Sequence, residues 1–296
     1  MVKETDATNN AVTTARVIKT MSNLFTVDAG GEFITCTARK KLKAESGILT
    51  GDFVLVEREG GEYVISEILP RKNSLIRPPV ANIELLVAVA ALVPKVDYFL
   101  LDKLIINAER HGIGVVLCLN KSDLSRELYA ELCAQYDGMV EQIIVTSASL
   151  DEVSELKAVL SGRLTCLCGQ SAVGKSSLIN ALTGCRLQKT DAVSVKSERG
   201  KNTTTRAELI PISDSTYLID TPGFSMLDIH GVLPEELALY YPEYVGVVSE
   251  CKYRGCTHTT EPGCRVRALV ESGALNRFRY DRYRMMYDEL KAKSKR

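Results

Sequence analysis

The sequence lacks a net charge, a long apolar run and an apolar N-terminus, and each absence excludes a class of protein. Its 37 Lys and Arg residues balance 37 Asp and Glu residues, so the chain as a whole has no general attraction to nucleic acid. No apolar run is long enough to span a bilayer. Residues 1–6 also lack the apolar core of a secretion signal, so we expect a cytoplasmic protein with no membrane partner.

A disulfide framework is not expected either. The nine cysteines are odd in number, and Cys118, Cys166 and Cys168 lie within apolar, strand-like runs, which is typical of reduced thiols in the cytosol.

What the sequence does have is length and uneven charge. Its 296 residues indicate two or three domains. From Cys251 to Arg296, twelve Lys and Arg residues face five Asp and Glu residues, a surplus of seven positive charges.

The N-terminal part predicts a small barrel. Residues 1–12 are polar, and we expect them to be disordered. Residues 13–72 show five short strand patterns, which indicate a closed β-barrel of the OB type. The expected strands cover 15–20, 24–28, 32–37, 52–57 and 63–69. The basic run 39–43 is expected in a loop, where either nucleic-acid contact or a solvated charged loop is compatible with the sequence.

Residues 80–232 alternate between strand and helix patterns, after a proline-rich linker at 71–79. This alternation predicts a doubly wound α/β domain with a parallel sheet. The expected strands cover 83–92, 114–119, 142–145, 164–168, 207–212 and 216–220. The expected helices cover 97–111, 125–136 and 151–160, with a further helix from Lys175.

The stretch around Lys175 predicts a phosphate-binding loop. Residues 169–176 match G-x-x-x-x-G-K-[ST], whose backbone N–H groups surround a phosphate chain at a helix N-terminus. In such a loop Lys175 reaches the β- and γ-phosphates, which makes it a candidate catalytic residue, and Ser176 binds Mg²⁺. The predicted nucleotide contacts are Gly169, Gln170, Ser171, Ala172, Val173, Gly174, Lys175, Ser176 and Ser177.

A second motif predicts that the base is guanine. Asn120, Lys121, Ser122 and Asp123 form N-K-x-D at the end of a predicted strand, where open α/β sheets place ligand contacts. The Asp123 carboxylate can accept hydrogen bonds from N1–H and the 2-amino group of guanine, whereas adenine offers neither donor there. Asn120 is expected to brace the loops and Lys121 to cover the base. Ser147 and Ala148 follow the next strand, where a backbone N–H can reach the guanine O6.

Two further segments predict contacts to the γ-phosphate and magnesium. Asp220 and Gly223 belong to D-T-P-G after an apolar strand, where the Asp holds Mg²⁺ through water and the Gly N–H contacts the γ-phosphate. Residues 203–205 are three threonines, of which Thr204 or Thr205 is expected to bind Mg²⁺ when the triphosphate is present. The start of the next strand is the alternative interpretation of these threonines.

The motifs occur in an unusual order. In most GTPases the phosphate-binding loop precedes N-K-x-D, whereas here N-K-x-D at 120–123 precedes the loop at 169–176. A sheet survives such a permutation because chain termini often lie close together. The order therefore predicts a circularly permuted P-loop GTPase domain.

The C-terminal part, 233–296, predicts a zinc-binding, mainly helical domain. Cys251, Cys256, His258 and Cys264 place four soft ligands within fourteen residues, which suits one structural Zn²⁺ with a closed tetrahedral shell. Two helices are expected at 266–272 and 275–293. Their bases and aromatics suit either RNA contact or a tyrosine core with a solvated basic face: Arg277, Phe278, Arg279, Tyr280, Arg282, Tyr283, Arg284, Tyr287 and Lys291.

Taken together, the motifs resemble those of the circularly permuted GTPases of bacterial small-ribosomal-subunit biogenesis, the RsgA (YjeQ) family. The resemblance covers about 15–287 and rests on residues 120–124, 169–180, 200–205, 220–224 and 251–264. It implies an OB domain, a GTPase domain and a zinc domain. It also implies GTP hydrolysis stimulated by the small ribosomal subunit, late in the maturation of that subunit.

Three positions bear on this resemblance. Ala172 stands where members usually have Gly, and it fits if its φ is negative. Asn202 stands at the position of the family's favoured catalytic histidine, so it is the candidate residue there, although an amide cannot act as a base. Phe224 stands where Ras-like enzymes place a water-orienting Gln. We therefore expect slow intrinsic hydrolysis.

The main hypothesis is a monomeric GTPase that binds GTP or GDP with Mg²⁺ and is activated by the small ribosomal subunit. In this hypothesis the barrel and the zinc domain hold rRNA. An alternative is an RNA-binding assembly factor that uses GTP mainly as a structural ligand. An ATPase is a third, weaker alternative, which Asp123 argues against.

Overall fold

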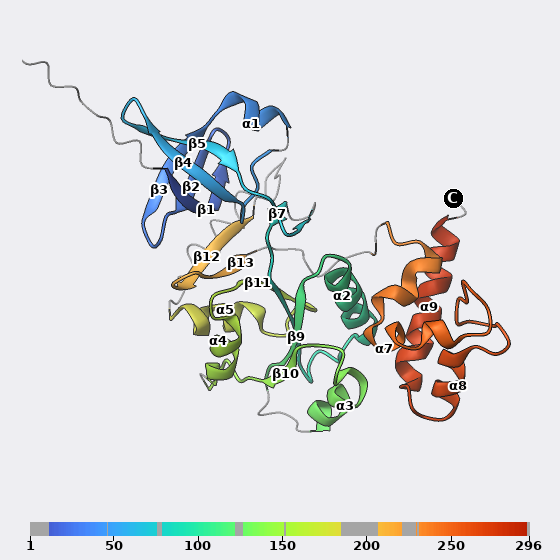
Figure 1. The fold of residues 1–296 in the computed structure, drawn as a ribbon. Helices are drawn as coiled ribbons and strands as arrows, with labels where there is room; N and C mark the ends of the chain where they lie inside the picture. The colour runs from blue at the N-terminus through green and yellow to red at the C-terminus, as the bar shows by residue number, and fades with distance from the viewer. Residues whose placement is uncertain are drawn as a thin grey trace, which may run out of the picture. The chain divides into compact units, whose positions relative to one another are not determined.

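The structure is a computed structural model, and its elements are drawn in Figure 1. It describes residues 12–45, 47–75, 79–121, 127–150, 152–184, 207–220, 229 and 231–294. The chain divides into two compact units, each built from segments that are distant in the sequence. The first comprises Met1–Glu84, Leu160–Cys166 and Leu187–Pro222, and the second comprises Leu85–Val159, Leu167–Arg186 and Gly223–Arg296. The boundaries expected near residues 72, 80 and 232 stay predictions.

The first unit contains the predicted barrel. Its strands are β1 (Thr13–Met21), β2 (Leu24–Asp28), β3 (Phe33–Ala38), β4 (Phe53–Glu59) and β5 (Glu62–Ile68). They lie in the order β1-β2-β3-β5-β4, and pairing of β1 with β4 closes the barrel, which confirms the OB-type prediction. Val17, Val27, Val54 and Ile65 are fully buried within it. This closure leaves the five strands without a free edge, which small antiparallel sheets otherwise expose.

The basic run after β3 was expected in a loop, and this expectation is wrong. Lys40–Glu45 form the short helix α1. The sequence K-K-L-K-A-E consists of residues with high helix propensity, which accounts for the helix. Arg39, just before it, pairs with Glu57 at 2.7 Å and with Glu59 at 2.5 Å. Part of the positive charge that suggested nucleic-acid contact is therefore neutralised within the barrel.

The rest of the first unit joins the barrel to a hairpin. Its elements are β6 (Ser74–Leu75), β7 (Val80–Ala81), β12 (Glu208–Ser213), β13 (Thr216–Asp220) and the first residues of β11 (Leu164–Cys168). β13 pairs in parallel with β11 and antiparallel with β12. β12 in turn meets β1, where Lys19 pairs with Glu208 at 2.8 Å. The predicted strands 164–168 and 216–220 are confirmed at both ends.

A cavity of about 640 Å³ lies within the first unit, and Arg16 is one of its lining residues. Arg16 is only 6% exposed, stacks 4.4 Å from the centre of the Phe53 ring and meets Glu84 at 3.4 Å. Burial lowers the pKa of its guanidinium, against the opposing charge of Glu84. The cavity lining includes none of the predicted nucleotide-binding residues.

The second unit contains the predicted alternation of strands and helices. Its strands are β8 (Leu85–Ala90), β9 (Gly114–Leu119) and β10 (Gln142–Val145), and its helices are α2 (Tyr98–Arg110), α3 (Glu127–Tyr136), α4 (Ser154–Leu160) and α5 (Lys175–Thr183). β9 pairs in parallel with both β8 and β10. Every residue of β8 is buried, as expected for a parallel strand covered on both faces.

The C-terminal part of the second unit is helical. Its elements are the 3₁₀ helices η2 (Pro234–Tyr240) and η3 (Val248–Glu250) and the α-helices α7 (Pro242–Val245), α8 (Arg265–Glu271) and α9 (Arg277–Ser294). Three tyrosines form the centre of its core, with the ring of Tyr241 5.1 Å from that of Tyr244 and 5.0 Å from that of Tyr283. Within the described part of the chain, every helix is too short or too polar to span a bilayer.

Candidate functional site

The phosphate-binding loop runs from the end of β11 to the start of α5, and two of its glycines have no room for a side chain. A Cβ on Gly169, where φ is +133°, would come within 2.3 Å of the carbonyl oxygen of Val89. A Cβ on Gly174, where φ is +98°, would come within 2.3 Å of Nδ2 of Asn120. The second glycine is therefore required by close packing of the N-K-x-D motif against the loop.

Asn120 and Lys121 both bind this loop directly. Asn120, which follows β9, is 1% exposed and donates from Nδ2 to the carbonyl oxygen of Val173 at 2.9 Å. Lys121 donates from Nζ to the carbonyl oxygen of Ala172 at 2.9 Å and to that of Val93 at 2.8 Å. Two motifs that are about fifty residues apart and in reversed order thus meet at one place, as a single nucleotide site requires.

The Ser-Ala segment after β10 meets the same asparagine. The backbone N–H of Ala148 donates to Oδ1 of Asn120 at 3.3 Å, and Oγ1 of Thr146 donates to the same oxygen at 3.4 Å. Ser147 is fully buried and its hydroxyl lies 3.0 Å from that of Ser149. Thr146 was not predictable as a site residue, because a threonine at a strand end carries no motif of its own.

Lys175 is the first residue of α5, and its side chain binds the backbone at the start of the loop. Its Nζ donates to the carbonyl oxygen of Gly169 at 2.8 Å and to that of Gln170 at 2.6 Å. Burial lowers the pKa of its ammonium group, against a weaker opposing effect of Cys168. Since α5 begins at Lys175, its first N–H groups and its helix dipole are oriented toward the same loop, which is favourable for phosphate.

Ala172 does not have the backbone conformation that its fit required. Its φ is +65°, in the left-handed region, so the condition for an unstrained fit of alanine is not met. The side chain is tolerated there at a conformational cost, since the left-handed region is unfavourable for residues with a Cβ. This explains why glycine suits the position better than alanine.

Several predicted site residues lie outside the described residues. These are Ser122, Asp123, Asn202, Thr203, Thr204, Thr205, Gly223 and Phe224, together with the side chain of Asp220. Their assignments to guanine, Mg²⁺ and the γ-phosphate stay predictions. Ser176 and Ser177 are described, in the first turn of α5.

The four predicted zinc ligands form one cluster. The ligand atoms of Cys251, Cys256, His258 and Cys264 all lie within 4.8 Å of one another. Nδ1 of His258 lies 3.6 Å from Sγ of Cys251 and 3.4 Å from Sγ of Cys264. Tetrahedral zinc with ordinary bond lengths separates a sulfur and a nitrogen ligand by about 3.6 Å, so the observed donor set fits Zn²⁺.

The loop at 251–264, called the zinc loop below, is held by groups that the sequence patterns did not reveal. The Glu261 carboxylate accepts from the N–H groups of Thr257 at 2.9 Å and of Thr259 and Thr260 at 3.1 Å. Tyr280 of α9 donates to the carbonyl oxygen of His258 at 2.9 Å. Burial lowers the pKa of His258, although the charge of Glu261 opposes this, and the effect favours the neutral imidazole that binds metal.

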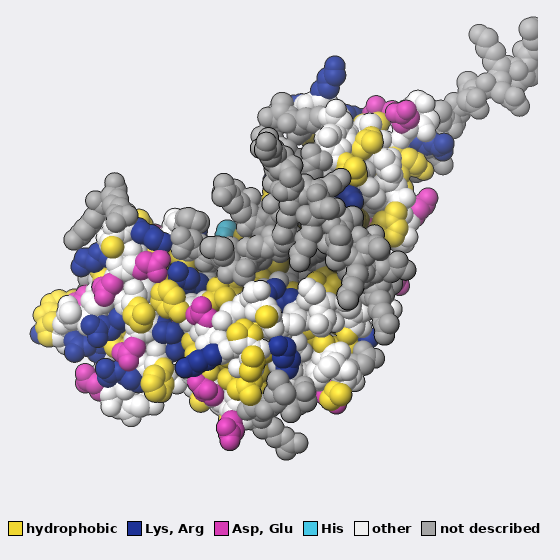
Figure 2. Space-filling model, turned by 180° about the vertical axis from the view of Figure 1, so that it is seen from behind, with side chains coloured by type: hydrophobic (Ala, Val, Ile, Leu, Met, Phe, Trp, Pro, Cys, Tyr) yellow, Lys and Arg dark blue, Asp and Glu magenta, His cyan; other side chains and the backbone are white. Residues whose placement is uncertain are grey.

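The basic side chains of α9 divide into two groups. Arg279 and Arg282 are 1% and 12% exposed and form ion pairs, so they do not belong to an RNA-binding surface or a solvated face. The tyrosines at 280, 283 and 287 are buried, as the core interpretation expects. Exposed basic residues remain elsewhere on α9, and Figure 2 shows Lys and Arg side chains gathered over the C-terminal part, at the left of the view, with acidic ones among them.

The fold and this arrangement of motifs define a circularly permuted P-loop GTPase. The family model described as RsgA GTPase matches residues 68–230. The chain belongs to the RsgA GTPase family. It is 39% identical over 274 residues to a small ribosomal subunit biogenesis GTPase RsgA of Agathobacter rectalis, covering 90% of each chain. It is 38% identical to the protein of that name in Moorella thermoacetica, over 94% of this chain and 98% of the relative.

Solved structures support the same assignment of the chain to this family. A structure described as YjeQ from Thermotoga maritima matches 95% of this chain and 99% of its own length, with a TM-score of 0.83 and 33% identity. A second, described as YloQ, a circularly permuted GTPase, matches 98% of both chains with a TM-score of 0.81 and 29% identity. The permuted order inferred from the motifs is thus confirmed.

Proposed function

We propose that this protein hydrolyses GTP to GDP and phosphate during late maturation of the small ribosomal subunit, and that the subunit stimulates the reaction. The observation that carries the proposal is the contact of Asn120 and Lys121 with the loop backbone at Val173 and Ala172. This contact joins the N-K-x-D motif to the phosphate-binding loop, which supports the binding of one guanine nucleotide by both motifs. Membership of the RsgA GTPase family and the names of the relatives support the biological setting.

In the proposed mechanism, positioning and electrostatics carry the chemistry. The N–H groups of residues 169–177 hold the phosphates, and Lys175 exchanges its two carbonyl partners for phosphate oxygens as negative charge develops on the leaving group. Ser176, Asp220 and Thr204 or Thr205 hold Mg²⁺, which neutralises phosphate charge. Gly223 contacts the γ-phosphate. Asn202 supplies no proton acceptor, so the bound subunit must order or complete the water-activating group.

In the proposed guanine site, Asp123 accepts from N1–H and the 2-amino group, Ser122 lies beside it, and Ala148 offers its N–H to O6. Asn120 braces these loops through its contacts with Val173 and Ala148. Exchange of Asp123 for Asn tests this assignment, because an amide can pair with the 2-oxo group of xanthine. Asp123→Asn is expected to weaken GTP binding and to strengthen xanthosine triphosphate binding. An unchanged preference for GTP contradicts the assignment.

We further propose that Cys251, Cys256, His258 and Cys264 hold one structural Zn²⁺, which supplies a closed crosslink for the loop and no reaction step. The protein is proposed to act as a cytoplasmic monomer whose partner is the small ribosomal subunit, contacted at rRNA by the barrel and the C-terminal part. Light scattering tests the monomer. Equal binding to rRNA by the wild-type protein and a variant lacking the exposed bases of α9 contradicts the proposed contact of the C-terminal part with rRNA.

The second candidate function is an RNA-binding assembly factor for which hydrolysis is incidental. The observation that favours it is Asn202 in place of the family's histidine. A variant that binds GTP but cannot hydrolyse it separates the two candidates: it fails to support subunit maturation if hydrolysis is required, and supports it if GTP is only a structural ligand. Lys175→Ala is assayed for GTP binding as well as hydrolysis, because Lys175 also contacts phosphate, and Asn202→His gives the opposite direction by restoring the family's histidine.

A further inference from the structure

One side chain of the phosphate-binding loop, that of Gln170, binds the start of α2. Oε1 of Gln170 accepts from the backbone N–H of Asp97 at 3.0 Å, and its Nε2 donates to the carbonyl oxygen of Lys95 at 3.1 Å. Asp97 is the N-cap of α2, where its Oδ1 accepts from the N–H of Leu100 at 2.9 Å. Both ends of the Gln170 amide therefore fix the place where α2 begins.

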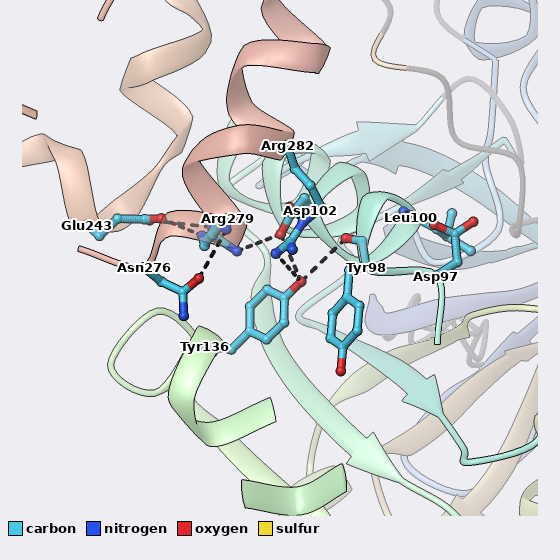
Figure 3. Close-up of polar contacts among 9 residues, drawn as sticks. All are labelled: Asp97, Tyr98, Leu100, Asp102, Tyr136, Glu243, Asn276, Arg279 and Arg282. Atoms are coloured by element: carbon cyan, nitrogen blue, oxygen red, sulfur yellow. Dashed lines mark hydrogen bonds and ion pairs between the residues drawn. The ribbon is translucent and has the colours of Figure 1, made fainter. Parts of the chain in front are cut away.

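The same helix is bound to α9 by a buried ionic cluster, shown in Figure 3. Asp102, which is fully buried, accepts from Nη1 of Arg279 at 2.7 Å, from Nε of Arg282 and from the Tyr136 hydroxyl at 2.9 Å. Arg279 also pairs with Glu243. Because an unpaired buried charge is strongly unfavourable, α9 cannot shift away from α2 without leaving a partner of Asp102 unpaired.

α9 is in turn bound to the zinc loop. Tyr280 donates to the carbonyl oxygen of His258 at 2.9 Å, and Tyr283 donates to that of Thr257 at 2.8 Å. Hydrogen bonds thus join the phosphate-binding loop to α2, α2 to α9, and α9 to the zinc loop. Asp97 and Asp102 lie less than two turns apart on α2, so a rigid helix is all that separates the two sets of contacts.

Nucleotide binding acts on the first member of this series. Lys175 donates to the carbonyl oxygens of Gly169 and Gln170, at 2.8 and 2.6 Å. Phosphate oxygens compete for the same ammonium group, so a bound nucleotide removes two restraints from the peptide units around Gln170. The residue whose backbone loses a partner is the one whose side chain holds α2.

We propose that Gln170 is a positioning residue that couples nucleotide occupancy of the phosphate-binding loop to α9 and the zinc loop, with α2 as the connecting element. This inference rests on the proposed function, since it requires a nucleotide at that loop. The coupling gives the ribosome-facing C-terminal part a contact with the nucleotide site that does not depend on the segments 185–206 and 221–228. Such coupling requires that α2 has two arrangements and that the nucleotide makes different contacts with the protein in each of them.

Hydrogen exchange of the full-length, zinc-loaded protein tests the coupling, with GDP as the ligand so that no turnover occurs. In the wild-type protein, saturating GDP is expected to change the exchange rates of the phosphate-binding loop and of amides in 277–294. In Gln170→Ala at saturating GDP, the change in the loop should persist and that in 277–294 should be lost. Gln142→Ala is the matched control, because Gln142 also uses its amide in a side-chain hydrogen bond, to Glu155 at 2.8 Å, but outside this series.

A double-mutant cycle supplies a second test. Gln170→Ala is expected to weaken GDP binding roughly fivefold through its two lost hydrogen bonds. Arg282→Lys, which keeps the charge but loses the guanidinium geometry at Asp102, is expected to weaken it about threefold if α2 transmits the effect. The double variant should then bind no more weakly than Gln170→Ala alone.

The outcomes are distinct. If wild-type protein binds GDP but 277–294 is unaffected, or if Gln170→Ala retains the wild-type change there, the coupling is contradicted while the proposed function stands. Fold-changes that multiply in the double variant also contradict it. Absence of GDP binding by the wild-type protein overturns the proposed function itself, and the coupling with it.

Discussion

Ala172 shows how a single residue can carry the cost of a functional loop. Its positive φ is imposed by the loop, while its carbonyl oxygen accepts from Lys121 at 2.9 Å. Neither feature could be foreseen from the motif pattern, since x positions of G-x-x-x-x-G-K-[ST] specify no φ. The need for glycine at 169 and 174, in contrast, was predictable from the motif, although the packing of Asn120 against Gly174 was not.

Ala172→Gly is expected to stabilise the protein by up to about 1 kcal/mol, because glycine adopts a positive φ without steric cost. Urea unfolding measures the change. Ala181→Gly in the last turn of α5 is the control, and it should destabilise by up to about 1 kcal/mol because glycine is a poor helix former. A loss of stability in both variants contradicts the assignment of strain to Ala172.

Glu84 predicts a pH dependence. Burial opposes its ionisation, but the Leu164 N–H and the charges of Arg16 and Lys72 outweigh this effect, so the pKa of Glu84 lies below its ordinary value. A lowered folded-state pKa gives stability that is present above the unfolded-state pKa and is lost as pH falls through the folded-state pKa.

As the pH is lowered below about 4.3, the free energy of unfolding should therefore decrease, and this decrease should be less steep in Glu84→Gln. Urea unfolding between neutral and acidic pH measures both curves. Parallel curves for the wild type and the variant would show that Glu84 contributes nothing to the acid dependence.

At the scale of elements, long periodic segments were predictable and irregular ones were not. Apolar runs bounded by turn residues placed β9, β10, β11 and β13 at their observed ends. Helix α1 was missed because six residues are too few for a periodic pattern. The 3₁₀ helices before the zinc loop were missed because tertiary contacts determine them, such as the burial of Leu237 of η2 in the core that α9 also contributes to.

The different roles of the arginines of α9 could not be predicted from the sequence either. Its arginines are alike in type and spacing, yet Arg279 pairs with Asp102 and Glu243 while Arg277 pairs with Asp281 at the surface. The acidic partners of Arg279 come from segments that are distant in the sequence, so no local pattern predicts them. The cluster of Cys251, Cys256, His258 and Cys264, by contrast, was predictable because the close spacing of these residues in the sequence is itself the signal.

Metal removal tests the zinc site at this scale. Cys264→Ala should lose its bound zinc, and hydrogen exchange of residues 251–264 should become faster because the loop has few apolar contacts to replace the metal. Cys133→Ala, on α3 and outside the cluster, is the control and should retain one zinc per chain. Full zinc occupancy in Cys264→Ala contradicts the assigned ligand set.

At the scale of the whole molecule, permuted order and spatial convergence are the main features. Local motifs predicted the site because N-K-x-D and the phosphate-binding loop each follow a strand end, and parallel strands bring such ends to one edge of a sheet. Which atoms meet could not be predicted, since it depends on side-chain packing between loops. The contact of Lys121 with Val93, for example, has no sequence signal.

GTP turnover measured against the concentration of small ribosomal subunits decides whether this protein is a subunit-activated GTPase, with Lys175→Ala as the inactive control. We expect very slow turnover by the protein alone, a rise on the order of tenfold or more with saturating subunits, and no such rise with Lys175→Ala. Equal turnover with and without subunits would show that the subunit does not activate the protein.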